Sequence, residues 1–304
     1  MQGIVLRSTG SFYDVLTDAG ARVICRTRGK LRLEGIKESN PVAVGDRVVF
    51  EGDNEVGSIT EILPRKNHIL RQSVKRTGHA HVLAANVDQA FLLVTLALPR
   101  TSTGFVDRFL VAAESFGIPQ TLVFNKTDLL SKEELDYQET LMDIYRNIGV
   151  GVISMSAFND DYKKLVPLLE GKTTLFAGHS GVGKSTLLNK IDPKISRKIG
   201  EISGFSEKGT HTTTFAEMFQ IGDKTFVIDT PGIKEWGMVD MNEQELSDYF
   251  PEMRERRLNC KFGSKCLHMN EPQCAVLDAV EKGEIAPSRY DSYISILSGK
   301  DNRK

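Results

Sequence analysis

The sequence predicts a multidomain α/β protein: an N-terminal OB-fold β-barrel, an α/β domain of permuted connectivity and a C-terminal helical domain. Three observations support this prediction. Short strand-like runs separated by glycines fill the first 63 residues, strand and helix patterns alternate from residue 88, and three of the four cysteines cluster near the C-terminus. A chain of 304 residues is long enough for two or three domains.

The N-terminal segment has five apolar or alternating runs, near residues 4–6, 12–16, 22–26, 47–50 and 56–63. Glycines between these runs mark turns. Five short strands suit an OB-fold barrel, and such barrels bind nucleic acids through strand faces and loops. Cys25 lies in one of the apolar runs, so we expect it in the core. We assign residues 1–65 to this domain.

Positive charge is concentrated near the N-terminus, although the net charge is only −1. Residues 1–81 hold 13 Lys and Arg against 9 Asp and Glu, and residues 62–87 contain no acidic residue. We assign residues 66–87 to a basic linker between domains. RNA phosphate is a plausible partner for this charge, whereas a solvated mixed-charge face and a merely flexible linker remain alternatives. The candidate RNA-binding residues are Arg22, Arg26, Arg28, Lys30, Arg32, Arg65, Lys66, Arg71, Lys75 and Arg76.

Strand and helix patterns alternate over residues 88–238, which predicts a parallel sheet covered by helices. Helical spacing occupies residues 103–116, 132–148 and 184–191. The apolar strand-like runs lie at 90–96, 121–124, 150–153, 173–176, 215–221 and 225–228.

A phosphate-binding pattern, Gly-x4-Gly-Lys-Ser, follows the run 173–176 and opens a helix. Its backbone N–H groups would converge on phosphate oxygens, Lys184 would neutralise the β- and γ-phosphates, and Ser185 would hold Mg²⁺. The expected nucleotide-binding residues in this loop are Gly178, His179, Ser180, Gly181, Val182, Gly183, Lys184, Ser185 and Thr186.

Two further motifs lie at the ends of predicted strands, where α/β sheets place ligands. Asp229, which begins an Asp-Thr-Pro-Gly sequence, would approach Mg²⁺ through water, and the N–H of Gly232 would meet a γ-phosphate. The motif Asn125, Lys126, Thr127, Asp128 follows the run 121–124. A carboxylate at Asp128 can accept both the ring N–H and the exocyclic amine of guanine, which selects GTP over ATP.

The loop that includes Ser156 and Ala157 follows the run 150–153 and would supply a backbone N–H to guanine O6. The Ser-Ala pair is informative only because of this position. The order of the motifs is unusual, because the base-reading motif precedes the phosphate loop. This inversion indicates a circularly permuted P-loop GTPase domain.

The C-terminal segment, residues 239–304, combines helical spacing at 242–250, 275–285 and 288–297 with a cysteine cluster. Three thiols and one imidazole form a ligand set typical of closed structural zinc sites, and a domain this small benefits from a metal. Reduced cysteines with an incidental histidine are the alternative. The candidate zinc ligands are Cys260, Cys266, His268 and Cys274.

No run of about 18 apolar residues and no signal-peptide pattern is present, so we expect a cytoplasmic protein without membrane contact. The cysteine cluster suits a metal site in a reducing compartment better than disulfides.

The motif order, the small N-terminal barrel and the cysteine spacing together resemble the RsgA (YjeQ) family of circularly permuted bacterial GTPases over nearly the whole chain. The resemblance implies stimulation by the small (30S) ribosomal subunit, contact with 16S rRNA, a role in late subunit maturation and a zinc motif at the cysteine cluster. The family's switch I has a His-Thr-Thr pattern. By resemblance, Thr213 senses Mg²⁺ and the γ-phosphate, with Thr212 as the alternative.

Many small GTPases place a water-orienting Gln directly after the Asp-x-x-Gly glycine, whereas this chain has Ile233. An aliphatic side chain cannot orient water, so we expect slow intrinsic hydrolysis. Our hypothesis is that His211 supplies the missing group when a ribosomal particle orders switch I; alternatively, it only shapes the loop.

The predicted reaction is Mg²⁺-assisted hydrolysis of GTP to GDP and phosphate, and we expect the protein to be a monomer. A nucleotide-gated RNA-binding adaptor with incidental hydrolysis is the alternative. An RNA-modifying GTPase has no supporting cysteine or cofactor loop in the sequence.

Overall fold

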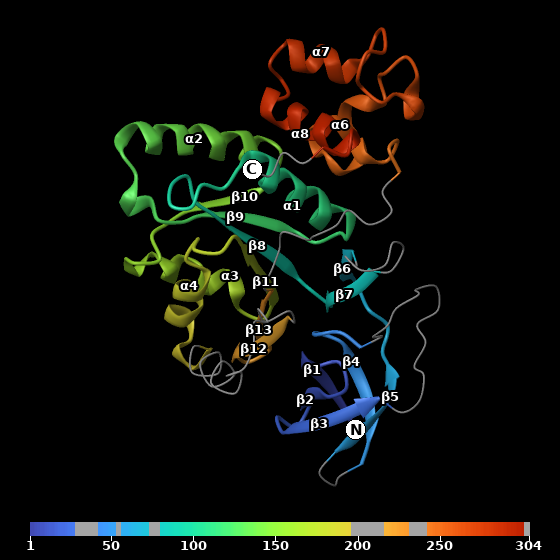
Figure 1. Cartoon of the computed structure of the whole chain (residues 1–304), viewed down its shortest axis with the longest axis vertical. Coiled ribbons are helices and arrows are strands. Elements are labelled where there is room, and N and C mark those ends of the chain that lie inside the picture. Colours follow the sequence, from blue (N-terminus) through green and yellow to red (C-terminus); the bar gives the residue numbers. More distant parts are fainter. Residues whose placement is uncertain (28–41, 53–55, 73–79, 196–215, 231–241, 301–304) are drawn as a thin grey trace.

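The computed structural model describes residues 1–27, 42–52, 56–72, 80–195, 216–230 and 242–300 (Figure 1). The N-terminal domain is a β-barrel. Its strands pair in the order β1-β2-β3-β5-β4 and close through β1 and β4, with β3 and β5 parallel. This closed five-stranded barrel confirms the OB-fold prediction. The strands are β1 (Gln2–Ser8), β2 (Tyr13–Thr17), β3 (Arg22–Thr27), β4 (Arg47–Glu51) and β5 (Gly57–Ile62).

The barrel core is made by the inward side of each strand. Val5, Val15, Phe50 and Ile59 are fully buried there, and Cys25 lies among them as predicted. Successive side chains of a strand point to opposite faces, so every second residue of these strands faces the core and the others face away from it.

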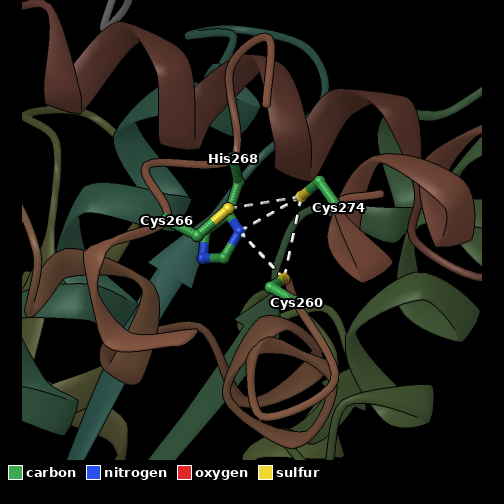
Figure 2. A group of neighbouring side chains, drawn as sticks. All are labelled: Cys260, Cys266, His268 and Cys274. Carbon is green, nitrogen blue, oxygen red and sulfur yellow. Dashed lines mark hydrogen bonds between the residues drawn. The ribbon is translucent and has the colours of Figure 1, made fainter. Parts of the chain in front are cut away.

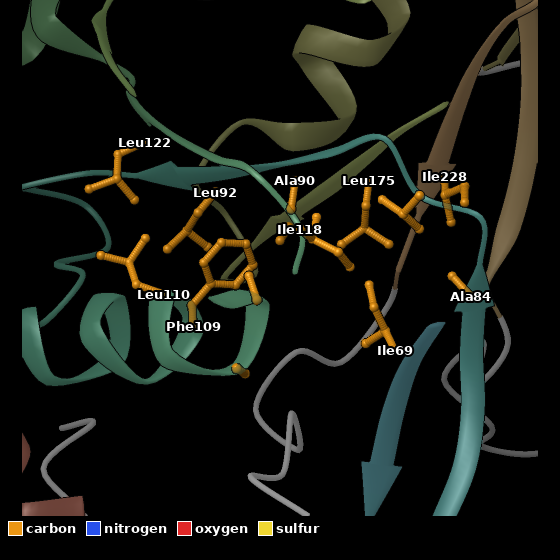
Figure 3. Packing of buried hydrophobic residues seen from close by; sticks show 14 of the residues in the cluster. Ile69, Ala84, Ala90, Leu92, Phe109, Leu110, Ile118, Leu122, Leu175 and Ile228 are labelled. Atoms are coloured by element: carbon orange, nitrogen blue, oxygen red, sulfur yellow. The ribbon is translucent and has the colours of Figure 1, made fainter. Parts of the chain in front are cut away.

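The segment predicted as a linker is instead an antiparallel hairpin, β6 (His68–Gln72) and β7 (Ala80–Ala85). The linker prediction is therefore wrong for these strands. Ile69 and Ala84 are buried in the same core as helix α1 (Thr103–Ser115) (Figure 3). These apolar contacts give the hairpin a fixed place between the barrel and the sheet.

The central domain is a sheet with helices on both faces. Its strand order is β10-β9-β8-β11-β13-β12, with β12 antiparallel to its neighbour β13. The elements are β8 (Gln89–Val94), α1 (Thr103–Ser115), β9 (Gln120–Phe124), α2 (Lys132–Asn147), β10 (Gly151–Ser154), α3 (Val166–Leu169), β11 (Thr173–Gly178), α4 (Lys184–Ile191), β12 (Glu217–Gly222) and β13 (Thr225–Asp229).

Alternate residues of β8 separate the two cores of this domain. Leu92 faces α1 and α2, with Phe109 and Leu122 packed around it (Figure 3). Phe91 and Leu93 belong to the opposite core, which α3 and α4 cover. Burial on both faces explains why the sequence of β8 is continuously apolar.

The barrel and the central sheet are joined edge to edge, since β1 pairs with β12 through Arg7 and Glu217. Leu6 and Leu16 from the barrel also enter the core that α1 covers.

The C-terminal domain packs on α1 (Figure 1). Val111 of α1 lies in its hydrophobic core with Phe250 and Tyr293. The helix predicted over 242–250 is not formed. A 3₁₀ turn (Leu246–Tyr249) occupies this segment, and a separate helix begins at Pro251 because Phe250 between them is extended. Its helices are α6 (Pro251–Arg257), α7 (Ala275–Glu281) and α8 (Pro287–Leu297). None of the helices in the described part of the chain has the length and apolar character needed to cross a bilayer.

Candidate nucleotide site and metal centre

The predicted nucleotide motifs meet at the carboxyl edge of the central sheet. Asn125 follows β9, the Ser156 loop follows β10, the phosphate loop follows β11 and Asp229 ends β13. All four strands are parallel, so their carboxyl ends lie at one edge. Ligands of open α/β sheets bind at this edge. Segments far apart in the chain thus form one site.

The phosphate loop connects β11 to α4 and depends on glycine. Gly183 has φ of +94°, and a Cβ atom there would lie 2.4 Å from the Asn125 side-chain nitrogen. Both the backbone angle and the space therefore require glycine. The loop ends where α4 begins, so the first N–H groups of this helix face the place where phosphates would bind.

Asn125 connects three loops of the site. Its Nδ2 donates to the carbonyl oxygen of Val182 at 2.8 Å, and its Oδ1 accepts from the N–H of Ala157 at 2.8 Å. The residue is only 2% exposed. It therefore fixes the phosphate loop and the Ala157 loop relative to the base-reading motif.

Both backbone N–H groups of the predicted guanine loop have partners within the chain. Ser156 donates to the Asp161 carboxylate at 3.1 Å, and Ala157 donates to Asn125. The hydrogen bond from Lys164 and, to a lesser degree, that from Ser156 lower the pKa of Asp161. A guanine O6 could accept from either N–H only by replacing an existing hydrogen bond.

Lys126 and Asp128 lie on a tight turn at the end of β9. Lys126 has φ of +64°, and its ammonium donates to the carbonyl oxygen of Leu98 at 2.6 Å. Asp128 follows in a 3₁₀ turn (Thr127–Leu129). The ammonium of Lys126 is thus anchored on the loop that carries Leu98.

Lys184 and Asp229 form an ion pair across the phosphate loop. Lys184 also approaches the carbonyl oxygen of Thr230, whose hydroxyl donates to Phe176 at 3.3 Å. The pair brings together the two groups expected to meet phosphate and Mg²⁺. A bound nucleotide would compete with Asp229 for the ammonium, and the freed carboxylate could then face the metal.

The second candidate site is the cysteine cluster of the C-terminal domain (Figure 2). Its four side chains are buried, and their ligand atoms all lie within 4.8 Å of one another. The Cys260 and Cys266 sulfurs lie 3.8 and 3.7 Å from that of Cys274, and His268 Nδ1 lies 3.6 and 3.3 Å from those of Cys260 and Cys274.

These spacings fit one tetrahedral ion. An ion with bonds of about 2.3 Å to sulfur separates its sulfurs by about 3.8 Å. The cysteines form no disulfide. Burial raises the pKa of the Cys266 thiol to about 12, so a metal must displace the proton to bind there. The four groups can therefore hold a metal ion with no coordination position left open.

A layer of hydrogen bonds supports the ligands. Tyr290 and Tyr293 of α8 donate to the carbonyl oxygens of His268 and Leu267, at 2.8 and 2.9 Å. The Glu271 carboxylate accepts from the N–H groups of Leu267 and Met269, both at 2.8 Å. The loop that carries His268 is thus fixed from both sides.

Comparison with known proteins identifies the family. A profile of the RsgA GTPase matches residues 62–239, and a profile of the RsgA N-terminal domain matches residues 2–59. The chain belongs to the RsgA GTPase family. It is therefore a GTPase, and the inverted motif order is that of the family.

Relatives of RsgA type match over the full length. The chain is 48% identical to the "Small ribosomal subunit biogenesis GTPase RsgA" of Christiangramia forsetii, covering 99% of this chain and 97% of that protein. It is equally identical to the "Small ribosomal subunit biogenesis GTPase RsgA 2" of Bacteroides thetaiotaomicron, covering 100% of this chain and 98% of that protein.

Two solved structures share the RsgA fold. YjeQ from Thermotoga maritima is 35% identical with a TM-score of 0.77, covering 100% of this chain and 99% of that one. YloQ, described as a circularly permuted GTPase, is 34% identical with a TM-score of 0.74, covering 100% of this chain and 96% of that one. Permuted connectivity is thus common to this chain and its structural neighbours.

Several predicted RsgA site residues fall outside the described residues. They are His211, Thr212, Thr213, Gly232 and Ile233. The same holds for Arg28, Lys30, Arg32, Lys75 and Arg76, and for the side chain of Arg71.

Arg65 requires a correction to the RNA-binding prediction. Its guanidinium is buried and binds the Asp46 carboxylate through two hydrogen bonds of 2.6 and 2.8 Å. The Asp46 carboxylate also accepts from the N–H of Ala43. Arg65 therefore supports the start of the hairpin and is not available to phosphate. Lys66 forms a partly exposed ion pair with Asp88.

Arg22 and Arg26 are exposed on β3, as an RNA-binding surface requires. The Arg26 guanidinium lies 4.1 Å from the ring centre of Phe12, which is itself partly exposed.

Sequence reasoning missed Arg289, which joins the C-terminal domain to α1. Its guanidinium donates to Asp107 and to Glu252, each at 2.7 Å, and all three side chains are buried. Burial lowers the pKa of Arg289, but the two carboxylates raise it more, so it stays charged. Asp107 lies on the buried face of α1, which is otherwise apolar. A charged residue at that position was the signal in the sequence that a buried partner exists.

Proposed function

We propose that this GTPase acts on the small ribosomal subunit during late maturation, and that the subunit stimulates hydrolysis of GTP to GDP and phosphate. The observation that carries the proposal is the full-length similarity to proteins named for small ribosomal subunit biogenesis. The Asn125 contacts support it, since they join the base-reading, phosphate and Ala157 loops into one nucleotide site.

The described residues divide the work of nucleotide binding. Asp128 reads the guanine edge, and the phosphate-loop N–H groups with Lys184 bind the β- and γ-phosphates. Ser185 and, through water, Asp229 would hold Mg²⁺, which would neutralise charge on the phosphates. The close approach of Lys184 to Asp229 supports this division, because phosphate and metal must lie together.

The hydrolytic step requires a group that orients the attacking water. We propose His211 for this role and Thr213, or else Thr212, for sensing Mg²⁺ and the γ-phosphate. The basis is the family resemblance together with Ile233, which cannot orient water. A ribosomal particle would bring His211 into place, which would make hydrolysis conditional on the particle.

The metal centre is proposed to hold one zinc ion in a structural role. Three thiolates and one imidazole prefer zinc among common cellular metals, and four protein ligands leave no position for substrate. The ion would hold together the loops before and after His268.

Contact with 16S rRNA is proposed for the exposed arginines of β3, Arg22 and Arg26, and for the basic residues between β6 and β7. Phosphate contacts would make the association strongly salt-dependent. The protein would act as a cytoplasmic monomer.

A nucleotide-gated adaptor, in which hydrolysis is incidental, is the competing function. Release from small subunits separates the two. We expect wild type to dissociate after GTP addition and His211→Ala, which retains Lys184 and the phosphate loop, to remain bound with GTP. Equal release of both proteins would favour the adaptor.

A further inference from the structure

Phe158 is an exposed aromatic residue at the edge of the nucleotide site. It directly follows Ala157, whose N–H binds Asn125, and 79% of its surface is exposed. Single exposed apolar side chains are common on protein surfaces, so the position of this ring next to Ala157 of the nucleotide site, and not its exposure, carries the inference.

The backbone of Phe158 is held in place although its ring is exposed to solvent. The Lys190 ammonium of α4 donates to the Phe158 carbonyl oxygen at 2.5 Å. The same ammonium lies 5.9 Å from the Phe158 ring centre and 5.8 Å from that of Tyr162. Since α4 begins at the phosphate loop, the position of Phe158 is fixed relative to both the phosphate-binding and the base-reading groups.

Binding of a purine requires contacts to its flat faces as well as hydrogen bonds to its edge. Asp128 can satisfy the polar edge of guanine, but the two flat faces remain apolar and must be covered to be removed from water. Lys126 directly precedes the turn that contains Asp128, and its ammonium is anchored on the carbonyl oxygen of Leu98. Phe158 stands on the neighbouring Ala157 loop, and an aromatic ring stacks on any base with little cost in conformational freedom.

We propose that the Phe158 ring stacks on the guanine base of GTP and GDP and provides part of the nucleotide affinity. The inference rests on the nucleotide-site assignment under Proposed function. Because the contact is to the base, it contributes equally to GTP and GDP and is independent of Mg²⁺ and of the ribosomal subunit.

The test measures the affinity of the full-length protein for GDP and for GTP by calorimetry without subunits. We expect Phe158→Ala to weaken both by about tenfold, and Phe158→Trp to retain affinity close to wild type. Phe262→Ala removes another partly exposed ring, in the C-terminal domain, and should change neither affinity.

A second measurement uses fluorescence. In a Trp236→Phe background, the indole of Phe158→Trp should be quenched when GDP binds. Unchanged affinities of Phe158→Ala, or a loss for GTP only, would overturn the stacking proposal.

Asp128→Asn separates this proposal from the site assignment. It should shift preference from guanine to xanthine nucleotides. If that shift occurs while Phe158→Ala binds normally, only the stacking is wrong; if neither variant changes binding, the assigned base site is wrong as well.

Discussion

The side-chain amide of Asn125 donates a 2.8 Å hydrogen bond to the carbonyl oxygen of Val182, 57 residues later in the chain. This contact joins the base-reading motif directly to the phosphate loop. Because it is a contact in space, it survives the inverted order of the motifs. A permuted connection therefore leaves the geometry of the nucleotide site intact.

Gly183→Ala should disrupt this contact. A Cβ atom there would lie 2.4 Å from Asn125 Nδ2, at a backbone angle that L-residues rarely adopt. We expect loss of the two Asn125 hydrogen bonds, a cost of about 1–3 kcal/mol beyond backbone strain, and much weaker GDP binding. Calorimetry and thermal unfolding measure both effects.

Gly149→Ala is the matched control for Gly183→Ala. Gly149 also has a positive φ, +83°, but a Cβ atom added there would meet no other atom within 4 Å. It should cost about 1–2 kcal/mol of stability and leave GDP affinity unchanged. Equal nucleotide affinity in both variants would contradict the role given to the Asn125 contact.

Removal of the metal should unfold the C-terminal domain selectively. The four buried ligands join loops of a domain whose hydrophobic core is small. Chelation, or Cys274→Ser, is expected to release about one zinc per chain and to expose this domain to protease. Elemental analysis and limited proteolysis provide the measurements.

Cys25→Ala serves as the control for metal release, because Cys25 is buried in the barrel core. It should retain the metal. Freshly purified wild-type protein that contains no zinc would count against the proposed centre.

Arg289→Met should destabilise the attachment of the C-terminal domain to α1. It leaves the buried carboxylates of Asp107 and Glu252 without their cation, a change that costs about 3–5 kcal/mol. Arg256→Met breaks a more exposed pair with Glu284 and should cost less than about 1 kcal/mol. Denaturant unfolding compares the two; similar stabilities would refute a special role for Arg289.

His211→Ala should abolish the hydrolysis that small subunits stimulate and preserve GTP affinity. The expectation follows from Ile233, which leaves the site without a water-orienting glutamine. Single-turnover hydrolysis with subunits and equilibrium GTP binding are the two readouts. An undiminished stimulated rate would show that His211 only shapes its loop.

The local motifs could be predicted from sequence because each follows a recognisable strand. The helix 184–191 and the strand before it were predicted at nearly their observed bounds, since glycines and an apolar run mark them. The hairpin of β6 and β7 was missed, because its charges suggested a solvated segment while its fixed place depends on Ile69 and Ala84 packing against distant parts of the chain. Arg65 lies 19 residues from its partner Asp46, and Arg289 lies 37 and 182 residues from Glu252 and Asp107. Single-sequence patterns carry no information about such pairs.

GTP turnover with and without purified small ribosomal subunits tests the proposed function most directly, with ATP, large subunits and free RNA as controls. We expect small subunits to accelerate hydrolysis of GTP but not of ATP, and neither large subunits nor free RNA to reproduce the effect. Turnover that is unchanged by small subunits would contradict the proposed function.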